Sequence, residues 1–200
     1  MLDGPLVFVD IDTQRDFLEP SGALYVPGST EILPNLERLT AFARARGIPV
    51  LATACAHTLD EPDPEPFPPH CLVGTPGQSR VAATSWPGGT VLGADARFEG
   101  PSLPSHLTIE KHRYDVFTHP DAARVVSLYA LKHPTFVVYG VATDYCVKAA
   151  VLGLLERGGR VAVVTDAIRA VDPAAEPAVL AEFVRFGAVL TTTEGVVGGG

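Results

Sequence analysis

The chain has 200 residues, of which 46% are hydrophobic and 19% are charged, a composition typical of a folded globular protein. Fifteen Lys and Arg residues against 23 Asp and Glu residues give a net charge of −8. That balance argues against nucleic-acid and anionic-membrane partners, because phosphate groups bind basic surfaces. No apolar run reaches the length of a bilayer span and no signal peptide is readable, so we expect a cytoplasmic protein.

Short apolar runs alternate with helical patterns along the chain. The runs that predict buried strands lie at residues 6–9, 49–53, 107–109, 136–139, 161–164 and 188–190. The helices predicted between them begin at Ser29 or Thr30 and stop at Gly47, run from a cap at Asp121 through Leu131, and cover residues 145–157 and 174–186. This order predicts one α/β domain over residues 1–200, a three-layer α/β/α fold with a doubly wound, mainly parallel sheet. The order of the strands does not follow from the sequence.

Residues 55–104 interrupt this alternation. The segment is rich in Pro and Gly, most densely at residues 61–69, and shows little periodicity. Loops of this length are either linkers or functional. Because strand patterns continue on both sides, we interpret the segment as a loop that forms part of a site.

Three reactive side chains follow three different predicted strands. Asp12 comes after the first strand, Lys111 after the third and Cys146 after the fourth, at the predicted start of a helix. Sites in doubly wound folds lie at the carboxyl ends of the strands, so these groups are predicted to meet. A helix start and a nearby lysine both favour a thiolate, and a carboxylate can carry its proton.

Each of these residues has a less specific interpretation when it is taken alone. A cysteine near a helix start is more often a small buried side chain, an aspartate after a strand is usually a cap, and a lysine is usually solvated. Only the occurrence of all three residues at the ends of predicted strands indicates a catalytic site. With three cysteines, an odd number, the chain does not suggest a disulfide framework. We expect Cys146 to be the activated thiol, and Cys55 and Cys71 to be unactivated or masked by a metal.

Two segments of the chain resemble the isochorismatase-like cysteine hydrolases. Residues 11–17 (IDTQRDF) are similar to the family's D-x-Q-x-D-F opening, and residues 140–147 (GVATDYCV) resemble its nucleophile segment. Lys111 falls where the family's catalytic lysine is expected. The resemblance implies that Cys146 is the nucleophile, Asp12 the general acid and base, and Lys111 the partner that stabilises the thiolate.

The resemblance also implies a mechanism. A cis peptide bond between Val141 and Ala142 would aim the Ala142 amide, together with that of Cys146, at a developing oxyanion. Asp12 would take the thiol proton, Cys146 would attack an amide carbonyl, and ammonia would leave with the proton. Water activated by the same carboxylate would then hydrolyse the thioester.

The Pro/Gly-rich loop points to one subfamily. Residues 67–77 (FPPHCLVGTPG) resemble a stretch of the nicotinamidases, which bind a divalent metal through an Asp and three His. His57 and His70 match two of those ligands. The sequence departs from the pattern twice, since Cys55 stands where the Asp is expected and residues 58–69 contain no His.

Cys55, His57 and His70 still form an acceptable zinc set with one open position, and a thiolate favours zinc over harder ions. Zinc is therefore the predicted metal, with iron and manganese as alternatives. The competing interpretation is that Cys55 is buried packing and that both histidines bond loop carbonyls.

Aromatic side chains complete the predicted pocket. Phe17 and Phe67 match family positions that sandwich the substrate's pyridine ring, although aromatic pairs usually belong to a core. The sequence does not decide whether Trp86 and Tyr114 also line the pocket. Asp16 is predicted to be structural, because Asp12 already fills the acid–base role.

The leading functional prediction is therefore a nicotinamidase, which converts nicotinamide and water to nicotinate and ammonia. The alternative is a metal-independent hydrolase of the same family that acts on another small amide, carbamoyl or enol-ether substrate, and a more remote one is a catalytically silent binding protein. The expected partner is a small-molecule amide, without nucleic acid or membrane. Family members commonly assemble, so the resemblance implies a homo-oligomer.

Overall fold

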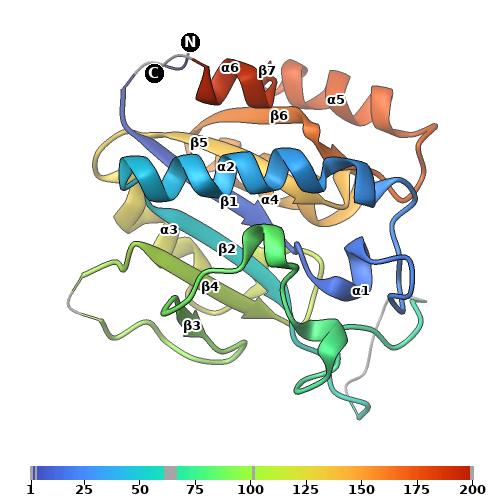
Figure 1. Ribbon diagram of the computed structural model, residues 1–200. Coiled ribbons are helices and arrows are strands. Elements are labelled where there is room, and N and C mark those ends of the chain that lie inside the picture. The colour runs from blue at the N-terminus through green and yellow to red at the C-terminus, as the bar shows by residue number, and fades with distance from the viewer. Residues whose placement is uncertain (1, 3, 61–66, 101, 199–200) are drawn as a thin grey trace.

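A computed structural model describes residue 2 and residues 4–60, 67–100 and 102–198. A seven-stranded parallel sheet forms the centre of the molecule (Figure 1). Its strands, in spatial order, are β3 (Thr90–Leu92), β4 (His106–Lys111), β2 (Val50–Cys55), β1 (Leu6–Ile11), β5 (Thr135–Val141), β6 (Arg160–Arg169) and β7 (Val189–Thr191). The predicted α/β class with a mainly parallel sheet is confirmed.

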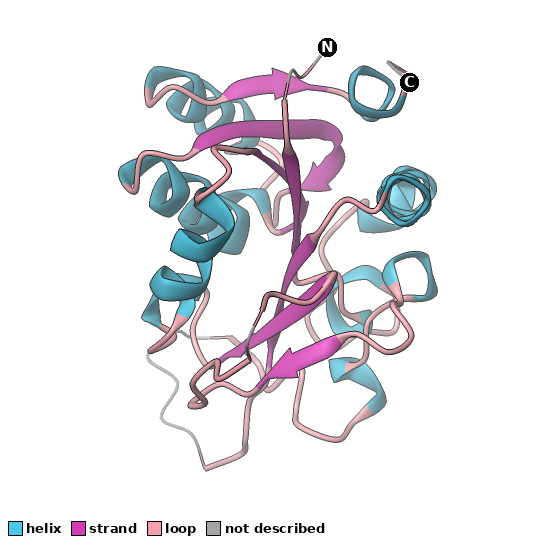
Figure 2. Ribbon diagram, turned by 90° about the vertical axis from the view of Figure 1, so that its left-hand side faces the viewer, coloured by secondary structure: helices cyan, strands magenta, loops and turns pink. Residues whose placement is uncertain are grey.

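Helices cover both faces of this sheet, as the view along it shows (Figure 2). The helices are α1 (Arg15–Leu18), α2 (Leu33–Arg46), α3 (Ala122–Ala130), α4 (Lys148–Glu156), α5 (Glu176–Arg185) and α6 (Thr193–Val197). Apolar side chains of α3, α4 and α5 pack against one face of the central strands, and those of α1, α2 and α6 pack against the other. Because successive residues of β1 point to opposite faces, Val7 and Val9 join the first layer and Phe8 joins the second.

Three elements were not predicted from the sequence, namely the edge strand β3 and the short helices α1 and α6. Each has five or fewer residues, too few to show a hydrophobic period. β3 lies inside the Pro/Gly-rich loop and pairs with β4, so tertiary contact rather than local pattern makes it a strand.

Two predicted helix starts differ from the structure in their local geometry. Asp121 stands at the N-cap position of α3, as predicted, but its carboxylate makes no capping bond and accepts hydrogen bonds from the Phe98 N–H, at 2.8 Å, and from Arg124. The helix predicted from residue 145 begins as a π-helical turn over Thr143–Val147, and regular α4 follows. Turns of this kind are frequent at functional sites, where they place a side chain out of helical phase.

The strand order creates a switch point next to β1. The chain builds β2, β3 and β4 on one side of β1 and then returns to build β5, β6 and β7 on the other. At such a point the loops after neighbouring strands diverge and leave a crevice at their carboxyl ends. Asp12 follows β1 there, and Ala142 follows β5.

None of the helices in the described part of the chain is long and apolar enough to cross a membrane. All three cysteines are buried and free.

Candidate active site

The three predicted catalytic side chains meet at this crevice. The ammonium Nζ of Lys111 lies 2.8 Å from Oδ2 of Asp12 and 3.7 Å from Sγ of Cys146. Asp12 and Lys111 are almost entirely buried, and Cys146 is 9% exposed. A carboxylate that follows β1 and a thiol that follows β5 thus both contact the ammonium group at the end of β4.

The Asp12 carboxylate is fixed from the neighbouring strand β2. Thr53 donates a hydrogen bond from Oγ1 to Oδ1 of Asp12 at 2.6 Å, and the Asp12 N–H bonds the carbonyl of Thr53 at 3.3 Å. Asp12 itself has a positive φ of 47°, which turns the chain away from β1 at that point. Its second oxygen, Oδ2, remains directed at Lys111.

Burial and charge act in opposite directions on this pair. Burial raises the pKa of Asp12, and the charge of Lys111 offsets part of that rise. Burial by itself would lower the pKa of Lys111, but the charges of Asp12, Cys146 and Cys55 hold it well above the ordinary value. A carboxylate with a raised pKa is a stronger base, and Lys111 stays charged beside it.

A second thiol, that of Cys55, contacts the same Lys111 ammonium group. Nζ of Lys111 lies 3.2 Å from Sγ of Cys55, and that sulfur lies 3.8 Å from Oδ2 of Asp12. Cys55 ends β2, beside Lys111 at the end of β4, and the two residues are paired in register. The sequence predicted Cys55 only as a metal ligand and did not place it next to the nucleophile.

Cys55 and Cys146 share one hydrogen bond, and the pKa values of the two thiols shift in opposite directions. A hydrogen bond from Cys146 lowers the pKa of Cys55 well below the usual value, and Lys111, His57 and His70 lower it further. The same hydrogen bond, together with burial, raises the pKa of Cys146. These directions run against the expectation that Cys146 is activated and Cys55 is not, which stays a prediction for the protein with its metal ion bound.

Cys55 also belongs to a cluster of metal-ligating side chains. The ligand atoms of Cys55, His57 and His70 all lie within 4.8 Å of one another. Donor atoms around a tetrahedral zinc ion are separated by about 3.3–3.8 Å, so small side-chain movements would close the cluster on an ion. Nδ1 of His70 lies 2.8 Å from the carbonyl of Pro68, which leaves Nε2 as the ligating atom, as is usual for zinc-bound histidine. The donor set fits zinc.

One side chain that sequence reasoning missed positions this cluster. Gln14 is fully buried, donates from Nε2 to the Cys55 carbonyl at 2.8 Å, and accepts the Cys55 N–H on Oε1 at 2.7 Å. Its Nε2 also bonds the carbonyl of Gln78, which ties β2 to the loop. The glutamine of the D-x-Q-x-D-F opening was the available signal. Asp16 of the same opening accepts the Cys71 N–H at 2.6 Å, which agrees with a structural role.

The thiols and the histidines line one pocket. Phe17 and Phe67 line it as well, and so does Tyr145, which the sequence analysis did not select. The rings of Phe67 and Tyr145 meet edge to face with centroids 5.3 Å apart, and Phe17 lies 5.3 Å from the ring of His70. Tyr114 also lines the pocket, whereas Trp86 stacks on His106 away from it.

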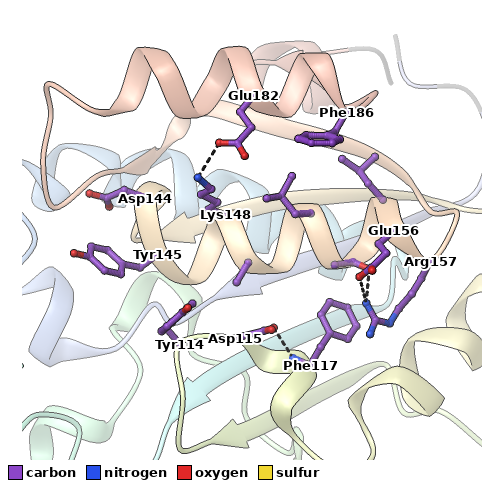
Figure 3. A pocket seen from close by; sticks show the side chains of 14 residues that line it. Tyr114, Asp115, Phe117, Asp144, Tyr145, Lys148, Glu156, Arg157, Glu182 and Phe186 are labelled. Atoms are coloured by element: carbon purple, nitrogen blue, oxygen red, sulfur yellow. Dashed lines mark hydrogen bonds and ion pairs between the residues drawn. The ribbon is translucent and has the colours of Figure 1, made fainter. Parts of the chain in front are cut away.

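A second, wider hollow lies over α4, between α5 and the segment around Tyr114 (Figure 3). Lys148 and Glu182 form an ion pair of 2.8 Å across it. Tyr114 and Tyr145 belong to the walls of both hollows. Neither the three predicted catalytic side chains nor the three predicted metal ligands line this second hollow.

The peptide bond between Val141 and Ala142 is cis, as the resemblance implied. The carbonyl of Ala142 accepts hydrogen bonds from the N–H groups of Tyr145 and Val147, at 3.1 and 3.0 Å. These bonds start the π-helical turn that presents Cys146 to the pocket. Comparison with known families agrees with this arrangement, since a family model described as the isochorismatase domain matches residues 6–195. The chain belongs to the isochorismatase family.

Relatives within and around this family include amide hydrolases. A nicotinamidase of Escherichia coli (strain K12) is 29% identical over 187 residues, which cover 84% of each chain. The crystal structure of a pyrazinamidase of Pyrococcus horikoshii in complex with zinc is 26% identical, with a TM-score of 0.76, and the match covers 94% of this chain and 98% of that one. An N-carbamoylsarcosine amidase from Thermoplasma acidophilum shares the fold at 21% identity, with a TM-score of 0.73 over 95% and 97% of the two chains. The chain is thus an isochorismatase-family hydrolase, similar to nicotinamidases.

Proposed function

We propose that the protein is a nicotinamidase that hydrolyses nicotinamide to nicotinate and ammonia through a thioester on Cys146. The observation that carries the proposal is a single pocket lined by the Cys146 thiol, the Cys55–His57–His70 cluster and two phenylalanine rings, with Asp12 and Lys111 directly behind the thiols. The similarity to nicotinamidases and to a zinc-containing pyrazinamidase supports the same function.

In the acylation step Asp12 removes the proton of Cys146 as the sulfur attacks the amide carbon. Burial, which raises the pKa of Asp12, strengthens this base, and Lys111 stabilises the charge that develops between carboxylate and thiolate. The backbone N–H groups of Ala142 and Cys146 are the proposed donors to the oxyanion. Asp12 then gives its proton to the departing ammonia.

In the deacylation step Asp12 removes a proton from water, and the hydroxyl attacks the thioester carbonyl. The bond to Sγ of Cys146 breaks, the thiol regains its proton from Asp12, and the product leaves as nicotinic acid, which ionises to nicotinate in water. One carboxylate serves both steps because Lys111 keeps it ionised at the start of each cycle.

Cys55, His57 and His70 would hold a zinc ion in the same pocket as the attacking thiol. When bound, zinc supplies a Lewis acid that recognises the ring nitrogen of a pyridine, directly or through water. Phe17 and Phe67 would flank the flat ring and supply stacking that is indifferent to that nitrogen.

A second candidate is a metal-independent amide hydrolase of the same family. The observation that favours it is Cys55, which replaces the expected aspartate ligand and is already engaged by Lys111 at 3.2 Å. Lys111 and a metal ion would compete for the Cys55 thiolate, which lowers the affinity of the site for the ion. A carbamoyl or ureido substrate would need no ring nitrogen to be recognised.

The deciding experiment is an ammonia assay on nicotinamide, pyrazinamide and benzamide, with zinc supplied and with chelator added. We expect nicotinamide and pyrazinamide to react and benzamide to react far more slowly, because an unpaired polar site costs binding energy. Equal rates on nicotinamide and benzamide would mean that the metal cluster does not recognise the ring. No ammonia from nicotinamide with zinc supplied would refute the nicotinamidase proposal and favour the second candidate.

A further inference from the structure

Two thiols stand at the same ammonium in this protein. Nζ of Lys111 lies 3.2 Å from Sγ of Cys55 and 3.7 Å from Sγ of Cys146. The sulfurs come from different parts of the fold, one from the end of β2 and the other from the turn after β5. Both residues line the substrate pocket, so a small oxidant that enters the pocket reaches both.

The third cysteine provides a contrast. Cys71 is fully buried and its N–H is bonded to the Asp16 carboxylate. It is not among the residues that line the pocket. Of the three cysteines, only Cys55 and Cys146 combine contact with a common partner and access from the pocket.

We propose that Cys55 is a resolving thiol for Cys146, and that a hydroperoxide converts the pair to a reversible intramolecular disulfide. In the first step the Cys146 sulfur attacks the terminal oxygen of the hydroperoxide. An S–O bond forms, the O–O bond breaks, and the second oxygen leaves as water or an alcohol with the thiol proton. In the second step the Cys55 sulfur attacks the sulfenic sulfur of Cys146, the S–S bond forms and the S–O bond breaks. The hydroxyl leaves as water with one proton, taken from the Cys55 thiol or, when Cys55 is a thiolate, from the Lys111 ammonium beside it. The hydroperoxide is reduced by two electrons and the two thiols are oxidised.

The disulfide has two consequences beyond the proposed amide hydrolysis. It removes the nucleophile, and it removes one of three candidate metal ligands. Two histidines alone bind zinc weakly, so oxidation is expected to release the ion. Conversely, zinc on Cys55 is expected to slow the second step because it occupies the sulfur. A thiol reductant restores both functions.

The test maps the disulfide by mass spectrometry and does not depend on amide turnover. Cys55 and Cys71 lie on one tryptic peptide, residues 47–80, and Cys146 lies on another, residues 133–148. Cys71→Ser therefore makes the assignment unambiguous. The metal-free full-length protein is treated with hydrogen peroxide, its remaining thiols are blocked, and the digest is analysed without reductant.

We expect peptides 47–80 and 133–148 to be joined in the wild type and in Cys71→Ser, and to separate on reduction. Free thiols should fall from three to one in the wild type. In Cys55→Ser, whose fold is checked by circular dichroism, Cys146 should instead advance to sulfinic acid, which reductant does not reverse. Cys146 found as sulfinic acid in Cys71→Ser while Cys55 remains free would overturn the proposal. A disulfide that needs Cys71 would overturn it as well.

Discussion

Two buried carboxylates at the carboxyl end of β1, Asp10 within the strand and Asp12 just after it, have different roles. Asp10 pairs with Arg80 and accepts a hydrogen bond from Thr13 at 2.9 Å, and Arg80 in turn bonds the carbonyl of Thr53. Asp12 pairs with Lys111 at 2.8 Å. Burial raises the pKa of both carboxylates, so neither burial nor a cationic partner distinguishes them.

The difference lies in what surrounds the ion pair. Arg80 donates hydrogen bonds to Asp10, Thr13 and the Thr53 carbonyl, none of which is a nucleophile. Lys111 instead contacts two thiols that line a pocket. A buried ion pair therefore serves stability where its partners are inert and chemistry where a nucleophile shares it.

The largest effect is expected from Asp12→Asn. An amide does not accept the thiol proton, so kcat should fall by about 10²- to 10⁴-fold, while far-ultraviolet circular dichroism stays native. Ammonia release from the preferred amide measures this loss. Turnover close to the wild-type rate would remove Asp12 from the acid–base role.

Asp10→Asn should lower stability and leave activity nearly unchanged, the opposite of the effect expected for Asp12→Asn. It leaves the mostly buried Arg80 cation without a counter-charge, so the free energy of unfolding should fall by about 3–5 kcal/mol, with kcat of the folded protein nearly unchanged. Urea denaturation and the ammonia assay measure the two quantities. The matched control is Asp10→Asn combined with Arg80→Met, which removes both charges and should recover much of the stability. A kcat loss as large as that of Asp12→Asn would mean that the two carboxylates do not differ as described.

The predicted metal ligands are tested by measuring the zinc content of the protein. His57→Ala and His70→Ala should each lose zinc that the wild type retains at close to one equivalent after dialysis, because two ligands bind far more weakly than three. Elemental analysis of protein without an affinity tag gives the content. His133→Asn, at an exposed histidine with a φ of 49° that asparagine tolerates, is the control and should keep the metal. Retention of zinc by either alanine variant would mean that the ion is bound at a different site.

The smallest effect concerns a histidine that belongs to neither carboxylate pair. His106 stacks on Trp86, and among the described residues neither of its ring nitrogens has a hydrogen-bond partner. Burial, together with the charges of Arg80 and Arg44, lowers its pKa from 6.5 to about 4. The unfolded chain therefore binds the extra proton first, and stability is lost as the pH falls from 6.5 towards 4.

His106→Phe keeps the stacked ring and removes the titration. The difference in the free energy of unfolding between pH 7 and pH 5, measured with urea, should be smaller in this variant than in the wild type. An unchanged difference would assign the acid sensitivity to other groups.

The sequence predicted long elements better than short ones. Runs such as residues 136–139 and 161–164 are apolar enough to mark β5 and β6, and Gly47, with a φ of 62°, ends α2 where it was expected. The 3₁₀ turn Ser29–Ile32 precedes α2, which explains why its start was ambiguous from the sequence. β3 escaped prediction because pairing with β4, and not its own three residues, makes it a strand.

By itself the sequence determined which reactive groups follow which strands, because the carboxyl end of a buried strand is marked by the end of its apolar run. Asp12, Lys111 and Cys146 were found in this way, and the motifs around them identified the family. Only the tertiary structure decided that Cys55 stands beside Cys146. That contact depends on β2 and β5 flanking β1, on Lys111 projecting from β4 between the sulfurs, and on a π-helical turn that shifts Cys146 out of helical phase. Strand order and local helix phase arise from long-range packing, which no local pattern in the chain encodes.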